Sequence, residues 1–101
     1  MQVKSEAPPQ ELKLFIDGQW VDAGPQIEVH NKYSGEVLAT LPSARQQEVD
    51  AAFGAAERAA QVMADMPAHK RADILARASA LIRQRGDELA RSIAAEAGKA
   101  L

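Results

Sequence analysis

The residues that could do chemistry in this sequence are few, and their spacing fails the common catalytic templates. Gly98-Lys99 looks like the end of a phosphate-binding P-loop, but that loop needs Gly at position 93 and Ser or Thr at position 100. Ile93 and Ala100 stand there instead, so a helix C-terminus is the better explanation of Gly98. G-x-S-x-G is also missing, which leaves no nucleophile elbow around the serines Ser34, Ser79 and Ser92.

The titratable side chains are equally dispersed. His30 and His69 fall in different expected elements and have no H-E-x-x-H partner, so each is expected at the surface. Asp87 and Glu88 are adjacent on an expected helix, where their side chains diverge, which disfavours paired acid–base catalysis. Because the sequence contains no cysteine, disulfides, cysteine-ligated zinc and a thiol nucleophile are excluded within these residues. We expect no catalytic and no cofactor-binding residue in this chain.

The composition indicates one small domain with a thin core. The chain has 101 residues, and 47% of them are apolar. Alanine makes up 21 of these residues, whereas only four residues are aromatic. Fully burying a Leu, Ile or Phe contributes roughly 1.5–3 kcal/mol, and Ala much less. A core of this kind is expected in a part of a larger protein. The sequence has no apolar run suited to a signal peptide or a membrane span. A cytoplasmic protein is expected.

The elements that would position any site begin with two antiparallel hairpins, over about residues 12–40. Asp17-Gly18 lies between residues 14–16, which are all apolar, and residues 19–21, of which Trp20 and Val21 are apolar, and this is a strong signal for a tight hairpin turn. Gly24-Pro25 interrupts the second arm. Residues 27–29 and 36–40 then form a second pair around a turn. Residues 1–11, which include Pro8-Pro9, are expected to be a flexible leader.

Two or three helices are expected over about residues 43–97, which makes the chain an α+β protein. Ser43 with Gln46 fits a capping box at the start of the first helix, and Pro67 ends that helix. Gly86-Asp87 is expected to divide the rest into two helices, with Gly98 as the final stop. Seven apolar residues of this part lie within an arc of about 120° at ~100° per residue, which is broad enough to contact more than one neighbouring element. They are Ile74, Leu75, Ala78, Leu81, Ile82, Leu89 and Ile93.

Six short motifs in the right order resemble the opening of the aldehyde dehydrogenase superfamily. They cover residues 14–101, and each is mostly structural by itself. The family patterns are I-x-G-x-W (residues 16–20), N-P-x-[ST]-G (31–35), D-V-D-x-A-V-x-x-A (48–56), R-A-x-x-L-x-x-x-A (71–78, shifted by one at the last Ala), [DE]-E-L-A (87–90) and E-x-G-K (96–99). Lys32 replaces the usual Pro, and Met63 stands where many members have Trp. Residues 63–75 look more like the branch that acts on lactaldehyde, phosphonoacetaldehyde and glyceraldehyde 3-phosphate.

The resemblance implies that residues 12–101 are the amino-terminal part of the Rossmann-like α/β cofactor-binding domain of an NAD(P)-dependent enzyme. In that family a Cys thiolate attacks the aldehyde, hydride passes to NAD or NADP, and a Glu-activated water releases the carboxylic acid. The cysteine, the general base and the cofactor contacts lie beyond Leu101 in the family pattern. The chain alone is therefore expected to be inactive and to bind no cofactor. Its expected partners are the remainder of the enzyme and further copies of the same protein.

One family feature maps onto this chain, namely a site for a monovalent cation. By motif position, its ligands would be the backbone carbonyls of Val29 and His30 and the side chain of Glu96. Oxygen ligands suit a hard cation. Members with this site usually carry Asp where Glu96 stands. The alternative is that Glu96 caps the helix or pairs at the surface.

Two other functions remain open from the residues themselves. The first is a non-enzymatic helical interaction or dimerisation module with a small β arm, which the missing active site favours. The second is a nucleic-acid binder, because residues 68–101 carry a net charge of +3 against −5 for residues 1–67. The basic residues of such a nucleic-acid binder would be Lys70, Arg77, Arg85 and Arg91. Interspersed acidic residues and the absence of aromatic residues argue against this function. We expect neither nucleic acid nor membrane as a partner.

Overall fold

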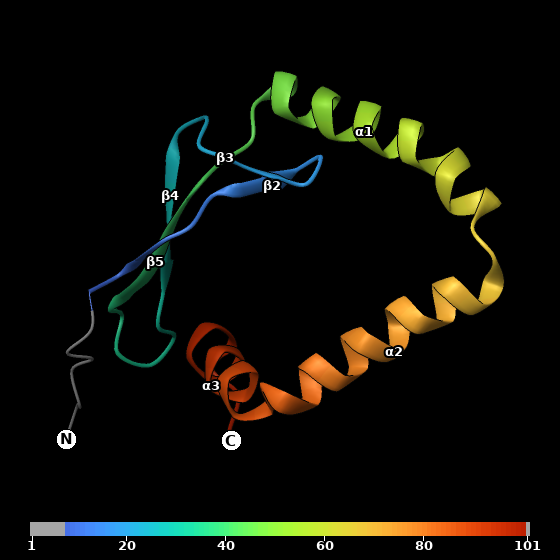
Figure 1. Ribbon diagram of the computed structural model, residues 1–101. Helices are drawn as coiled ribbons and strands as arrows, with labels where there is room; N and C mark the ends of the chain where they lie inside the picture. The colour runs from blue at the N-terminus through green and yellow to red at the C-terminus, as the bar shows by residue number, and fades with distance from the viewer. Residues whose placement is uncertain (1–7, 101) are drawn as a thin grey trace.

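The computed structural model describes residues 8–100. It confirms the α+β class, with short strands followed by three helices (Figure 1). In chain order the elements are β1 (Gln10–Glu11), β2 (Leu14–Ile16), β3 (Gln19–Val21), β4 (Gln26–His30), β5 (Val37–Pro42), α1 (Gln46–Asp65), α2 (Ala68–Gln84) and α3 (Gly86–Ala97).

The first hairpin forms as the Asp-Gly signal predicted. β2 pairs antiparallel with β3, and the turn residues Asp17 and Gly18 both have positive φ, at 52° and 72°. Such angles match the right-handed twist of the two strands. Phe15 and Trp20 lie opposite each other in this hairpin, and their rings are tilted against each other with centroids 4.8 Å apart. Arg58 of α1 donates a hydrogen bond to the Asp17 carboxylate at 3.1 Å, so the hairpin turn lies against the first helix.

The second hairpin becomes part of a three-stranded sheet with the order β1-β5-β4. β4 and β5 are antiparallel, as expected, and Ala39 of the central strand β5 is buried. β1 pairs parallel to β5, with Gln10 opposite Ala39. This strand falls inside the expected leader 1–11, whose residues 1–7 lie outside the described part of the chain. A two-residue strand paired across 29 positions leaves no local pattern in the sequence, which is why the pairing was not expected.

The expected cap of the first helix was wrong. The helix begins three residues after Ser43, with Arg45 as its N-cap, and Glu48 takes the role assigned to Gln46. The Glu48 carboxylate accepts hydrogen bonds from the Arg45 backbone N–H at 2.8 Å and from the Arg45 guanidinium at 3.0 and 3.2 Å. A carboxylate satisfies an unpaired helix amide and interacts favourably with the positive end of the helix, which a neutral Ser–Gln pair does less well.

We expect Glu48→Gln to destabilise the protein in a pH-dependent way. The hydrogen bonds from the Arg45 side chain, which outweigh the opposing effect of burial, lower the pKa of Glu48 from 4.5 to about 2. Because the folded-state pKa is below the unfolded one, the stabilisation is full above pH 4.5 and is lost as the pH falls towards about 2. Thermal melting of wild type and Glu48→Gln should therefore differ most near neutral pH and converge in acid. Glu57→Gln, on the exposed surface of the same helix, is the control and should change little; a wild-type advantage that is independent of pH would contradict the prediction.

The helix boundaries follow the proline and glycine signals. Pro67 is the N-cap of α2, and the backbone changes direction at Arg85, between α2 and α3. Asp87 lies in the first turn of α3, as expected, and Gly98 ends that helix in the left-handed conformation, with φ of 68°. The Arg71 guanidinium donates to the backbone oxygens of Met63 and Met66, so it satisfies carbonyls at the end of α1.

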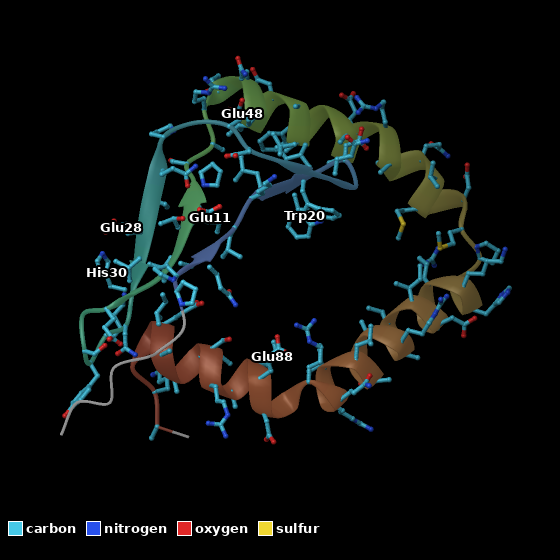
Figure 2. The ribbon with its side chains drawn as sticks, turned by 60° about the vertical axis from the view of Figure 1, so that its left-hand side comes forward. Glu11, Trp20, Glu28, His30, Glu48 and Glu88 are labelled. Atoms are coloured by element: carbon cyan, nitrogen blue, oxygen red, sulfur yellow. The ribbon has the colours of Figure 1, made fainter. Side chains whose placement is uncertain are left out.

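The three helices form an open arc instead of packing on the sheet as a layer (Figure 1). The described residues span 55 × 34 × 18 Å. Within residues 8–100, Ala39 and Pro42 are the buried apolar side chains, together with the single buried charge of Glu48. Large apolar side chains that face solvent include Trp20 at 71% exposed, Phe53 at 72% and Leu75 at 71%. Trp20 points from its hairpin into the space that the arc surrounds (Figure 2).

Candidate functional site

The three predicted cation ligands lie at the junction between β4 and α3. Val29 and His30 end strand β4, and Glu96 is in the last turn of α3. The Lys32 backbone N–H donates to the Ala95 carbonyl at 3.2 Å and so joins the turn after β4 to the end of the helix. The topology therefore brings both parts of the predicted site to one corner of the fold. That the three residues bind one ion together remains a prediction.

The turn after β4 is held by Asn31. Its side-chain oxygen accepts hydrogen bonds from the backbone N–H groups of Tyr33 and Ser34, at 2.8 and 3.0 Å. Its backbone carbonyl accepts from Gly35, and Gly35 has φ of 77°, a conformation that favours glycine. The Asn and Gly of the N-x-x-[ST]-G motif are thus explained by the turn itself. One consequence is a fixed backbone direction for Lys32, which lies inside this turn.

His30 uses both ring nitrogens within the same corner. Nδ1 lies 3.0 Å from the Gly35 carbonyl, and Nε2 lies 3.1 Å from the Glu28 carboxylate. Both partners are acceptors, so both bonds form only when both nitrogens carry a proton. His30 is exposed and points along the sheet edge with Glu28. It was expected at the surface, and the structure confirms that; only its backbone carbonyl belongs to the predicted cation site.

The Lys32 ammonium lies on that carbonyl. Lys32 Nζ donates to the His30 backbone oxygen at 3.2 Å. Two unit positive charges about 4 Å apart repel each other by about 4 kcal/mol at an effective dielectric constant of ~20. A free alkali ion on the same oxygen would meet that repulsion, and the oxygen would have to serve both cations. With the lysine in this position, a monovalent cation at the His30 carbonyl is disfavoured.

Glu96 contributes to a different feature of the surface. It is exposed and lines a groove of about 500 Å³ between α3 and the strands β1 and β5. Arg91 and Ser92 of α3 line the same groove, and Val37 and Ala39 are among its apolar residues. Neither Val29 nor His30 is among the groove-lining residues. This placement is consistent with the alternative, in which Glu96 caps the helix or pairs at the surface.

Two other features are absent from the part of the chain that the structure describes, namely a cluster of metal-ligating side chains and a membrane-spanning helix. Residues 8–100 contain no group of three or more His, Asp or Glu side chains placed to hold a metal ion. No helix in this range has the length and apolarity needed to cross a membrane. Arg85, one of the bases considered for nucleic acid, forms a bidentate pair with Glu88 of α3. What sequence reasoning missed is the position of Lys32; its signal was present as the replacement of the usual Pro.

The family of this chain follows from comparison with known proteins. Residues 20–101 match the aldehyde dehydrogenase family. Malonate-semialdehyde dehydrogenase 3 of Geobacillus kaustophilus is 43% identical over 90 residues, which is 87% of this chain and 19% of that protein. D-glyceraldehyde dehydrogenase (NADP(+)) of Picrophilus torridus is 40% identical over 90 residues, which is 87% of this chain and 18% of that protein. The chain thus spans about a fifth of the length of these relatives.

Solved structures agree with the sequence comparison. Aldehyde dehydrogenase 21 of Physcomitrella patens, in complex with the reaction product succinate, superposes with a TM-score of 0.87 at 33% identity. The match covers 92% of this chain and 20% of that one. A 1-pyrroline-5-carboxylate dehydrogenase variant of Thermus thermophilus gives a TM-score of 0.83 at 32% identity, covering 86% of this chain and 17% of that one. This chain belongs to the aldehyde dehydrogenase family.

Proposed function

We propose that this chain is the opening segment of the cofactor-binding domain of an NAD(P)-dependent aldehyde dehydrogenase that oxidises an aldehyde to a carboxylic acid. The segment acts as a scaffold in this function. It contains no cysteine for the nucleophile, and the cofactor contacts and general base implied by the family come from the remainder of the protein. Without that remainder the chain is inactive and binds no nicotinamide cofactor.

The observation that carries the proposal is the open arc of apolar helix faces. Leu75, Leu81 and Ile82 of α2 are each more than half exposed, and Ile93 of α3 is 57% exposed. Soluble proteins rarely expose apolar surface on this scale without a partner to cover it. The occupant that we propose is the Rossmann-like sheet of the same enzyme, because these helices otherwise leave their broadest apolar surface in water.

For the substrate we propose a small aldehyde that carries a polar group. The two curated relatives are named for malonate semialdehyde and D-glyceraldehyde, and residues 63–75 resemble the branch acting on lactaldehyde, phosphonoacetaldehyde and glyceraldehyde 3-phosphate. All of these are short aldehydes with a hydroxyl, carboxylate, phosphate or phosphonate group. We also propose that the enzyme works as a homo-oligomer in the cytoplasm.

The test is an activity assay of the full-length protein. We expect reduction of NAD or NADP, followed by absorbance, when the protein is mixed with short polar aldehydes, and the corresponding carboxylic acid as product by mass spectrometry. The isolated residues 1–101 serve as the control and should give no turnover. A full-length protein that is folded but reduces neither cofactor with any aldehyde of the panel would overturn the proposal in favour of a non-enzymatic interaction module.

A further inference from the structure

We propose that the side chain of Lys32 is a built-in replacement for a monovalent cation at the junction of β4 and α3. This inference depends on the scaffold role proposed above but not on any particular aldehyde. Its basis is the ammonium on the His30 carbonyl, one of the oxygens that family resemblance assigns to an ion. A positive charge is thereby supplied by the chain itself, and an ion from solution is not needed.

The backbone of Lys32 is held at the same junction. Its N–H donates to the carbonyl of Ala95, one of the carbonyls in the last turn of α3 that lack a partner within the helix. A proline at position 32 would have no N–H for this bond and no ammonium for the His30 oxygen. Lys32 therefore makes one contact to α3 and one to the end of β4 that the usual family residue cannot make.

The stem of Lys32 is packed against the helix end. A Cβ atom added at Gly98 would lie 3.3 Å from Lys32 Cβ, so the lysine stem crosses the C-cap of α3 closely. The carboxyl end of a helix carries a partial negative charge, which attracts a cation. The lysine stem thus lies against the helix end, and its ammonium contacts the His30 carbonyl dipole.

The experiment compares wild type, Lys32→Met, Lys32→Gln and Lys32→Arg in the full-length protein. Thermal melting is measured in matched concentrations of potassium, sodium and tetramethylammonium chloride, and binding of thallium(I), a potassium substitute, is followed by thallium NMR. We expect that the melting temperature of wild type is the same in the three salts, and that the same is true of Lys32→Arg. Lys32→Met and Lys32→Gln should melt several degrees higher in potassium or sodium than in tetramethylammonium, and should bind thallium more strongly than wild type does.

The difference between the uncharged variants and wild type decides the outcome. Equal thallium binding and equal salt dependence in wild type and both uncharged variants would overturn the proposal, as would a wild type that binds the ion more tightly than they do. Lys32→Gln keeps the test valid if Lys32→Met does not fold. Because neither measurement uses turnover, a protein without dehydrogenase activity would overturn the proposed function and leave this result readable.

Discussion

Gly24→Ala is expected to lower the stability of the protein by about 2–3 kcal/mol. Gly24 has φ of 90°, and a Cβ atom at this position would lie 2.1 Å from the Ser43 backbone oxygen. The conformation alone costs an L-residue roughly 1–2 kcal/mol. Relief of the clash must also separate the β3–β4 connection from Ser43, whose N–H donates to the Pro25 carbonyl at 2.7 Å. Loss of that bond adds about 1 kcal/mol.

Gly18→Ala is the matched control for this prediction. Gly18 also has positive φ, at 72°, but no atom lies within 4 Å of the position that its Cβ would take. It therefore tests the conformational cost without the clash, and about 1–2 kcal/mol is expected. Thermal melting of both variants of the full-length protein gives the comparison. Equal destabilisation would mean that the close approach of Gly24 to Ser43 has no energetic importance.

The comparison of Gly18 with Gly24 also illustrates what the sequence could predict about the fold. The Asp-Gly turn was predicted because its two residues determine the local angles themselves. Gly24 was predicted only to interrupt a strand, and its contact with Ser43 depends on how two segments far apart in the chain meet. The same reasoning applies to β1: Gln10 pairs with Ala39 by backbone hydrogen bonds, for which the side chains of a two-residue strand give no signal.

Prediction of the candidate site was limited for a related reason. Motif order assigned the family, and it placed Val29, His30 and Glu96 at one corner of the fold. It could not show that Lys32 reaches back to the His30 oxygen, because the direction of that side chain is set by the Asn31 turn and by packing on Gly98. The prediction of Ser43 as the helix cap was wrong for a similar reason. The Arg45 backbone N–H is bound by the charged carboxylate of Glu48 instead.

Leu75→Asp is expected to have opposite effects on the isolated segment and on the full-length protein. In residues 1–101 the Leu75 side chain is 71% exposed, so a charge there reduces apolar surface and should decrease self-association and the binding of an apolar dye. In the full-length protein the same side chain is buried if the proposed packing on the cofactor-binding sheet is correct. An uncompensated charge in such an interface costs about 3–5 kcal/mol, enough to lower the yield of soluble enzyme strongly.

Ala80→Asp controls for the loss of helix propensity and for the added charge. At ~100° per residue, position 80 lies about 140° from Leu75 around α2, on the side away from the apolar arc. We expect it to have a small effect in both proteins. Sedimentation velocity and dye fluorescence measure the isolated segment, and soluble yield and thermal melting measure the full-length protein. A wild-type segment that is a compact monomer without dye binding, together with a full-length protein that tolerates Leu75→Asp, would show that the helices do not require the covering sheet. Improved behaviour of the segment together with a destabilised full-length protein is specific to a surface that is exposed in the segment and covered in the enzyme. A residue with the same surroundings in both proteins would have the same effect in both when substituted.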